Sequence, residues 1–289
     1  MAKAGCGSFT KHHQQWRCTF DDEFGPKTHD SNRLRPRWWR AQKTADSAYY
    51  TGPPGRQACY FDNPQNVWVA GGSLHLRARE LPHQFHCLSG GGVTFLVRDS
   101  GSFYTRYTAG MVSTWHRFAQ LNGRFAVRAK VPATKMRGLQ ETLWLFPINP
   151  QKYGNVNEKS GEIDFAEFFS EYSRKTIPYI HYLKDRPGNP PSYDPTRNNN
   201  TELCPIHRGK FNTYVAQWSP GRIKIIVNGT TCLIDNYHPW HISPPAPFDQ
   251  PFFVVLTQAL GVGSNAFSPK STPLPATTEI DWVRIWKHD

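Results

Sequence analysis

The stretch GEIDFAEFF, residues 161–169, places three carboxylates among strongly apolar neighbours with the spacing Glu-x-Asp-x-x-Glu. Its β-branched and aromatic residues favour a strand. Successive side chains of a strand point to opposite faces, so Glu162 and Asp164 share one face while Ile163 and Phe165 share the other. The pattern therefore predicts a strand with one acidic face and one apolar face.

Glu167 joins the acidic face only if this strand is irregular. It lies five residues after Glu162, and in a regular strand this odd spacing points the two side chains in opposite directions. One extra residue, a β-bulge, returns Glu167 to the face of Glu162. We expect Ala166 to absorb the bulge because it is small and lies between Phe165 and Glu167. The two glutamates are then expected about 5–7 Å apart, at ~3.3 Å of rise per residue.

Two carboxyl groups on one strand face suit glycoside hydrolysis. Carboxylates among apolar residues are costly unless solvent, partners or a function account for them. A glycosidase uses one carboxyl group as nucleophile and a second as acid/base, and a separation of about 5–5.5 Å is typical of the retaining mechanism. The alternative is a solvated strand face that happens to carry three acids.

Short alternating strands and Gly- or Pro-rich turns recur along the chain, and no long segment has the 3.6-residue period of a helix. This pattern predicts an all-β fold, a β-sandwich or jelly roll. At 289 residues we expect an irregular N-terminal segment at 1–18 and a single sandwich domain at 19–289. The expected strands are 72–80, 107–115, 123–132, 141–147, 161–169, 176–183, 211–219, 222–235, 251–260 and 277–286, and the long loops 82–106 and 184–210 are expected to wall a cleft.

The chain resembles glycoside hydrolase family 16 in its bulge-containing laminarinase-like (endo-β-1,3-glucanase) branch. The family pattern Ser-Gly-Glu-x-Asp-x-x-Glu is matched by residues 160–167. Ordered matches to other family strands are 20–24, 66–67, 71–76, 109–113, 123–132, 143–147, 181–182, 214–218 and 279–284. The resemblance implies a jelly-roll β-sandwich of two antiparallel sheets with a substrate cleft on the concave face.

The same resemblance assigns roles to the three acids. Glu162 corresponds to the nucleophile and Glu167 to the acid/base. Asp164 corresponds to the residue between them, where its negative charge and a hydrogen bond to Glu162 keep the two glutamates in different protonation states. The implied function is retaining endo-hydrolysis of β-1,3-linked glucan (laminarin-like) or of a related polysaccharide.

Five further positions are candidates for substrate binding. Trp144 is expected on the cleft floor, where it either stacks on a sugar or belongs to the core. His181 lies on a strand adjoining the catalytic one and is expected to contact the substrate or Glu167, or to be structural. Gln140 and Asn157 stand where the family usually has aromatic residues, and Gln258 stands where Asn is common. The lost aromatic faces predict weak, absent or redirected activity on ordinary glucan, so the alternative function is a glycan-binding family member or an enzyme for an acidic polysaccharide.

Calcium is the one cofactor that the resemblance implies, in a structural site on the convex side. Glu23 and Gly72 are expected to offer backbone carbonyls and Asp281 its carboxylate, because calcium favours oxygen ligands. The alternative is that Asp281 caps a strand turn without metal.

The six cysteines contain no Cys-x-x-Cys pair, which argues against a zinc site. An even count allows three disulfides, and we expect local pairing; buried free thiols are the alternative. Disulfides are typical of oxidising compartments, so we expect a secreted or cell-envelope protein. The N-terminus lacks a signal-like apolar segment, so the alternatives are an export signal that was removed and a cytosolic protein. The expected pairs are Cys6–Cys18, Cys59–Cys87 and Cys204–Cys232.

A net charge of +12, from 34 basic and 22 acidic residues, favours polyanionic partners. The densest basic cluster interleaves with two tryptophans, but no nucleic-acid-binding motif accompanies it, so a polysaccharide rather than a nucleic acid is the expected partner. A merely solvated basic face is the other interpretation. No apolar run is long enough to span a membrane, and we expect a monomer. The cluster comprises Arg33, Arg35, Arg37, Trp38, Trp39, Arg40 and Lys43.

Overall fold

The computed structural model describes residues 5–11, 14–25, 34, 36–47, 49–88, 101–154, 157–186 and 198–288. Within them, helical segments are confined to α1 (Thr44–Ser47), α2 (Asn157–Ser160) and η1 (Gly263–Asn265). The strands are β1 (Phe9–Lys11), β2 (Gln14–Asp22), β3 (Arg40–Ala41), β4 (Ala58–Tyr60), β5 (Val67–Ala70), β6 (Ser73–Cys87), β7 (Phe103–Ser113), β8 (Gly123–Lys130), β9 (Leu139–Pro147), β10 (Glu162–Phe169), β11 (Lys175–Thr176), β12 (Tyr179–His181), β13 (Cys204–Pro205), β14 (Asn212–Ser219), β15 (Arg222–Val227), β16 (Thr230–Asp235), β17 (Phe252–Leu260) and β18 (Ala276–His288).

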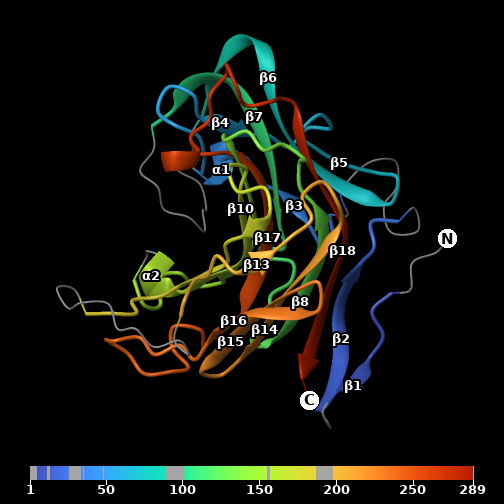
Figure 1. The fold of residues 1–289 in the computed structure, drawn as a ribbon, viewed down its shortest axis with the longest axis vertical. Coiled ribbons are helices and arrows are strands. Elements are labelled where there is room, and N and C mark those ends of the chain that lie inside the picture. The colour runs from blue at the N-terminus through green and yellow to red at the C-terminus, as the bar shows by residue number, and fades with distance from the viewer. Residues whose placement is uncertain are drawn as a thin grey trace.

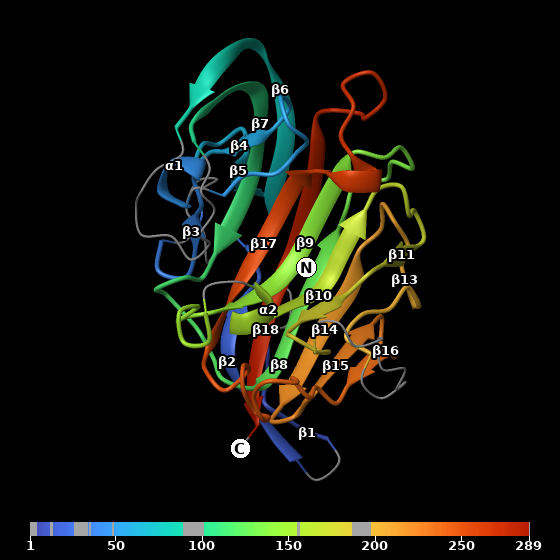
Figure 2. The ribbon, with the colours of Figure 1, turned by 90° about the vertical axis from the view of Figure 1, so that its left-hand side faces the viewer.

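These strands form two packed layers (Figures 1 and 2). One layer has the order β12-β10-β9-β17-β7, and the other has the order β6-β18-β8-β14-β15-β16. Because β6 and β7 are also hydrogen-bonded to each other, the two layers belong to one folded-over sheet. The pairs along this path are antiparallel, so the predicted jelly-roll β-sandwich of antiparallel sheets is confirmed.

The main core lies between the two layers. Ile163 and Phe165 of β10 and Leu145 of β9 contribute from one layer, while Val127 of β8 and Ile285 of β18 contribute from the other. All five are essentially inaccessible to solvent. Each large apolar side chain buried in this way stabilises the fold by about 1.5–3 kcal/mol relative to an exposed one. Packing of the apolar face of β10 therefore fixes which way its acidic face must point.

Segments 44–47 and 49–60, which we call the covering segment, pack on part of the opposite side of the β7–β17–β9 layer. Strand β4 pairs in parallel with β7, joining Ala58 to Tyr107. Tyr49 and Tyr60 stack with ring centroids 5.6 Å apart and belong to a second apolar cluster with Met111. This cluster removes part of that sheet surface from solvent.

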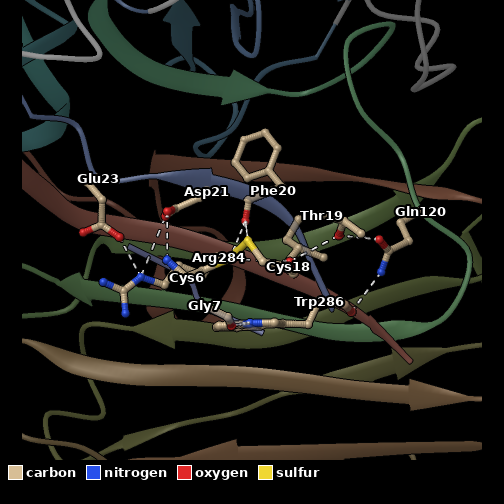
Figure 3. Close-up of a disulfide and its surroundings, with 11 residues drawn as sticks. Cys6, Gly7, Cys18, Thr19, Phe20, Asp21, Glu23, Gln120, Arg284 and Trp286 are labelled. Atoms are coloured by element: carbon tan, nitrogen blue, oxygen red, sulfur yellow. Dashed lines mark hydrogen bonds and ion pairs between the residues drawn. A yellow bond between two sulfur atoms is a disulfide. The ribbon is translucent and has the colours of Figure 1, made fainter. Parts of the chain in front are cut away.

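The N-terminal residues are more regular than expected. Their described part forms a hairpin of β1 and β2 rather than an irregular segment at 1–18, and β2 pairs with β18 along one side of the molecule (Figure 1). In Figure 3, the backbone N–H of Cys6 donates to Asp21 Oδ2 at 2.8 Å and Trp286 Nε1 donates to Gly7 O at 2.9 Å. The expected domain boundary at 18/19 therefore falls inside β2, which pairs with β18.

Three disulfides join Cys6 to Cys18, Cys59 to Cys87 and Cys204 to Cys232, which confirms the predicted pairing. The described part of the chain holds no helix long and apolar enough to cross a membrane.

Several strand boundaries differ from the expectation, some because hydrogen bonding continues into a predicted loop and one because a predicted strand contains a turn. Strands β6 and β7 extend into the predicted loop 82–106, with Phe85 paired to Thr105. The predicted strand 222–235 is a hairpin, because Asn228 and Gly229 both adopt positive φ and turn the chain between β15 and β16. The tips of both expected cleft walls, at 89–100 and 187–197, lie outside the described residues.

Candidate active site

Strand β10 lies between β12 and β9, and its register places the three carboxylates on one side of the layer. Glu162 faces His181 across the ladder with β12, and Asp164 faces Trp144 while Glu167 faces Thr142 across the ladder with β9. We call the side of β10 that carries Glu162, Asp164 and Glu167 the acidic face. The structure thus brings together the three residues that the sequence singled out as a catalytic group.

A β-bulge makes this alignment possible. The register of β10 with β9 shifts between Asp164 and Ala166, so that Phe165 is skipped. Phe165 and Ala166 are both fully buried in the core, and the alternation then resumes with Glu167 on the acidic face. The predicted bulge is present, but the extra residue is Phe165 rather than Ala166. The aromatic ring of Phe165 packs in the core.

Asp164 is held by His181. His181 Nε2 lies 3.1 Å from Asp164 Oδ2, and Tyr179 stacks on the imidazole with ring centroids 4.2 Å apart. Burial alone lowers the pKa of His181, but the hydrogen bond and charge of Asp164, with Glu167 and Glu158, outweigh it and raise the pKa above its usual value. His181 therefore tends to carry a positive charge that balances Asp164.

Glu162 is 7% exposed, and its Oε2 atom has no hydrogen-bond partner among the described residues. Burial raises the pKa of Glu162 well above its ordinary value, and the charge of Asp164 and a hydrogen bond with Asp164 add to the effect. The Oε2 atom, without a partner in the described part of the chain, is available to a bound molecule. A nucleophile needs such a free oxygen and acts in its ionised form.

Glu167 is anchored at both its backbone and its side chain. Thr176 Oγ1 and the backbone N–H of Ile177 each donate to its carbonyl oxygen at 2.8 Å. Gln140 Nε2 donates to Glu167 Oε1 at 2.7 Å. Burial, followed by the charge of Asp164, raises the pKa of Glu167 to about 8, while the hydrogen bond from Gln140 opposes the rise. Glu167 thus keeps its proton near neutral pH, as a general acid must.

Trp144 belongs to the core rather than to an open sugar platform. It is 3% exposed, its Nε1 donates to Thr257 Oγ1 at 3.0 Å, and the ring of Tyr49 from the covering segment lies 6.3 Å away. The core interpretation of Trp144 is therefore the one that the structure supports. Since Trp144 faces Asp164 across the ladder, the covering segment also bounds the acidic face on this side.

Gln258 does not reach the acidic face, so the prediction of substrate binding there is wrong. It is fully buried; its Nε2 donates to Glu141 Oε1 at 3.0 Å and its Oε1 accepts from Thr278 Oγ1 at 2.7 Å. Arg208 Nη2 donates to Glu141 Oε2 at 3.0 Å, and both side chains of this ion pair are buried. This network was not predicted from the sequence; its one signal is Glu141, the only charged residue of β9.

Asn157 begins helix α2, and its side chain lies outside the described residues, so its predicted role is not tested.

Trp39 of the basic cluster is buried and donates its Nε1 to Asp22 Oδ2 at 2.9 Å. Trp38 packs against the main core. Both described tryptophans are therefore structural, while Arg33 and Arg35 lie outside the described residues.

One of the predicted calcium ligands, the carboxylate of Asp281, already has a cationic partner. The carboxylate of Asp281 forms an ion pair with Arg128, and the carboxylate of Glu23 accepts a hydrogen bond from Arg284 Nε at 2.6 Å. Gly72 lies in the turn between β5 and β6 with φ +76°. Calcium prefers anionic oxygen ligands, and here a guanidinium holds the single carboxylate of the set. The ion pair with Arg128 disfavours a calcium ion at Asp281, and calcium binding stays a prediction.

The family is established by comparison with known proteins. Residues 63–284 match the model of glycosyl hydrolases family 16, and the chain belongs to this family. It is 26% identical over 240 residues to glucan endo-1,3-beta-glucosidase A1 of Niallia circulans, covering 79% of this chain and 32% of that protein. It is 25% identical over 260 residues to a beta-glucanase of Rhodothermus marinus, covering 84% of each.

The fold is also found among solved structures. The endo-beta-1,3-glucanase of Pyrococcus furiosus superposes with a TM-score of 0.69 at 22% sequence identity, over 98% of this chain and 99% of that one. The chain spans about a third of the Niallia circulans protein and most of the Rhodothermus marinus one, so the whole protein's activity remains a matter of proposal.

Proposed function

We propose that this protein is a retaining endo-glycosidase that hydrolyses β-1,3-linked glucan. The observation that carries the proposal is the bulge at Phe165, which puts Glu162, Asp164 and Glu167 on one face of β10. Membership of glycosyl hydrolases family 16 and the likeness to β-glucanases support the same reaction.

In the first step, Glu167 donates its proton to the glycosidic oxygen while the carboxylate of Glu162 attacks the anomeric carbon. The bond to the leaving sugar breaks and a glycosyl ester with Glu162 forms. In the second step a water attacks the same carbon, Glu167 accepts the proton of the water, and Glu162 leaves. Two inversions at one carbon retain its configuration.

Asp164 and His181 influence the protonation states of Glu162 and Glu167 during this reaction. Three carboxyl groups in one buried cluster cannot all be ionised cheaply, and the cluster titrates as a unit. A cationic His181 stabilises the ionised form of Asp164, and the charge of Asp164 keeps the proton on Glu167. The cluster therefore favours one protonated acid beside an ionisable nucleophile.

The experiment that tests the proposal is hydrolysis of laminarin followed by reducing-sugar release and by proton NMR of the first product. We expect a product of retained β-configuration from the wild type and none from Glu162→Gln. Glu80→Gln is a matched control, because Glu80 lies in β6 and pairs with Arg106 at the surface. Binding of laminarin without turnover would instead identify a glycan-binding member of the family, and a product of inverted configuration would refute Glu162 as nucleophile.

Three disulfides support a secreted or cell-envelope location, since disulfides persist in oxidising compartments. We propose that the protein acts there as a monomer on polysaccharide. Sedimentation velocity of the purified chain tests the oligomeric state.

A further inference from the structure

Gln140 and Glu167 are diagonal neighbours on β9 and β10. Gln140 pairs with Phe169 and Thr142 pairs with Glu167, so the two side chains lie on the same side of the layer, two residues apart along the ladder. Diagonal neighbours of this kind are close enough for long side chains to touch. Here the contact is a hydrogen bond of 2.7 Å from Gln140 Nε2 to Glu167 Oε1.

We propose that Gln140 is a positioning residue that decides which oxygen of Glu167 carries the catalytic proton. The inference rests on the proposed function of Glu167 as acid/base. It replaces the expectation that Gln140 is only a lost aromatic platform for sugar binding.

The amide N–H of Gln140 limits what the contacted oxygen of Glu167 can do. It donates, so the oxygen that it contacts must offer a lone pair. Glu167 Oε1 is thereby committed as an acceptor in both protonation states, and the proton resides on Oε2. In the first step Oε2 releases this proton to the glycosidic oxygen, and in the second Oε2 takes the proton of the attacking water. The same oxygen therefore serves both half-reactions without rotation of the carboxyl group.

The rest of Glu167 is already fixed, which makes the side-chain contact informative. Two donors, Thr176 and Ile177, hold its backbone carbonyl. Rotation about the side-chain bonds is the freedom that remains, and Gln140 restricts it. A misplaced acid/base group costs rate even when its substrate still binds.

The test compares Gln140→Leu with wild type, because leucine has a similar size and no donor. Loss of a hydrogen bond to the ionised form raises the pKa of Glu167, and carbon-13 NMR of the labelled carboxyl group measures this shift without any turnover. We expect a rise of about one unit, which is a tenfold change in ionisation. Gln217→Leu is the matched control, because Gln217 lies in β14 of the other layer, paired with Lys224 of β15.

Kinetics provide the second readout. With an aryl β-glycoside that has a good leaving group, the step that needs ionised Glu167 limits turnover. We expect kcat of Gln140→Leu to fall about tenfold, and azide, which attacks the glycosyl ester without a general base, to restore it. The basic limb of the pH profile should move to higher pH. If Gln140→Leu does not fold, Gln140→Met repeats the test with an unbranched side chain.

Gln140→Trp separates the two interpretations of this position. A positioning role predicts a lower kcat on laminarin, while a lost platform predicts a lower KM and a higher kcat/KM. An unchanged Glu167 pKa in Gln140→Leu, or unchanged kinetics with no response to azide, overturns the inference. If the wild type hydrolyses nothing, the proposed function fails, but the carboxyl pKa comparison still decides whether Gln140 controls Glu167.

Discussion

His181 faces Glu162 across the β12–β10 ladder, yet its Nε2 atom lies 3.1 Å from the next acid on the strand, Asp164. One imidazole on β12 thus lies beside two of the three acids of β10. Because the neighbouring carboxylates raise the pKa of His181, it supplies a positive charge to a group of three acids.

Replacement of this imidazole tests its role. His181→Asn removes the positive charge beside Asp164. Without this charge, the group of Glu162, Asp164 and Glu167 should keep its protons to higher pH. Hydrogen bonds to charged groups contribute about 1.5–3 kcal/mol, so we expect kcat/KM on laminarin to fall roughly 10- to 100-fold. The acid limb of the pH profile should move upward. A variant with unchanged kcat/KM would contradict the electrostatic role, and His207→Asn, which changes an exposed histidine, is the control.

The pH dependence of activity follows from the two glutamates. In the proposed mechanism, activity needs Glu162 ionised and Glu167 protonated. Since burial and Asp164 raise the pKa of Glu162, the acid limb of kcat/KM should lie above the ordinary value of 4.5. Because the pKa of Glu167 is about 8, the basic limb should lie near that pH. An initial-rate profile from pH 4 to 10 measures both limbs, and a basic limb that persists in Glu167→Gln would contradict this assignment.

The same shifts predict that stability falls as pH rises. A carboxyl group whose pKa is higher in the folded state binds more protons folded than unfolded between the two pKa values. By linkage, its contribution is then lost as pH rises from 4.5 to about 8. The raised pKa of His181 has the same effect, because its contribution to stability is also lost as pH rises. We expect the free energy of unfolding to drop by at least about 1 kcal/mol between pH 5 and 8. Urea unfolding at both values measures it, and Glu167→Gln should reduce the drop.

Removing one partner of the buried Glu141–Arg208 ion pair is expected to lower the free energy of unfolding more than replacing both partners. Removing one partner of such a pair costs about 3–5 kcal/mol, because the other charge stays buried. Arg208→Met should therefore lower the free energy of unfolding by about 3 kcal/mol. The double variant with Glu141→Leu should recover most of the loss. Equal destabilisation by the single and double variants would argue against this coupling, and urea midpoints measure it.

The engaged carboxylate of Asp281 gives an expectation for calcium. Because Arg128 already pairs with Asp281, neither added calcium nor EDTA should shift the melting temperature by more than about 1 °C. Differential scanning calorimetry measures this. Calcium-dependent stabilisation that disappears in Asp281→Asn would show that the metal displaces the guanidinium and would restore the predicted site.

Local patterns predicted the strand content, the disulfides and the acidic face of β10. Strand alternation and the pairing of neighbouring cysteines can be recognised from residues that lie close together in the sequence. The bulge position was one residue off. Sequence spacing demands an extra residue somewhere, but only core packing decides whether Phe165 or Ala166 provides it. The N-terminal segment is also more regular than predicted, because β2 pairs with β18 from the far end of the chain and β1 pairs with β2.

Side-chain roles that depend on the other layer were the hardest to predict. Gln258 was a candidate for substrate binding, but Thr278 of β18 and Glu141 of β9 hold it inside the sandwich. The sequence predicted Trp144 on the cleft floor, but it did not predict the contact of its ring with Tyr49, which belongs to a distant segment. Such contacts join residues more than a dozen positions apart, and alternation along one strand carries no information on them.

Strand β18 pairs with β2, β6 and β8, and it follows all three in the chain. During synthesis these earlier strands leave the ribosome with their hydrogen-bonding edges open, and they must wait for more than half of the polypeptide before the partner emerges. Non-local pairing of this kind slows folding and leaves nascent strands exposed to neighbours. The yield of active protein in a cell should therefore depend on chaperone supply and growth temperature, with cool, slow expression giving more of the native form.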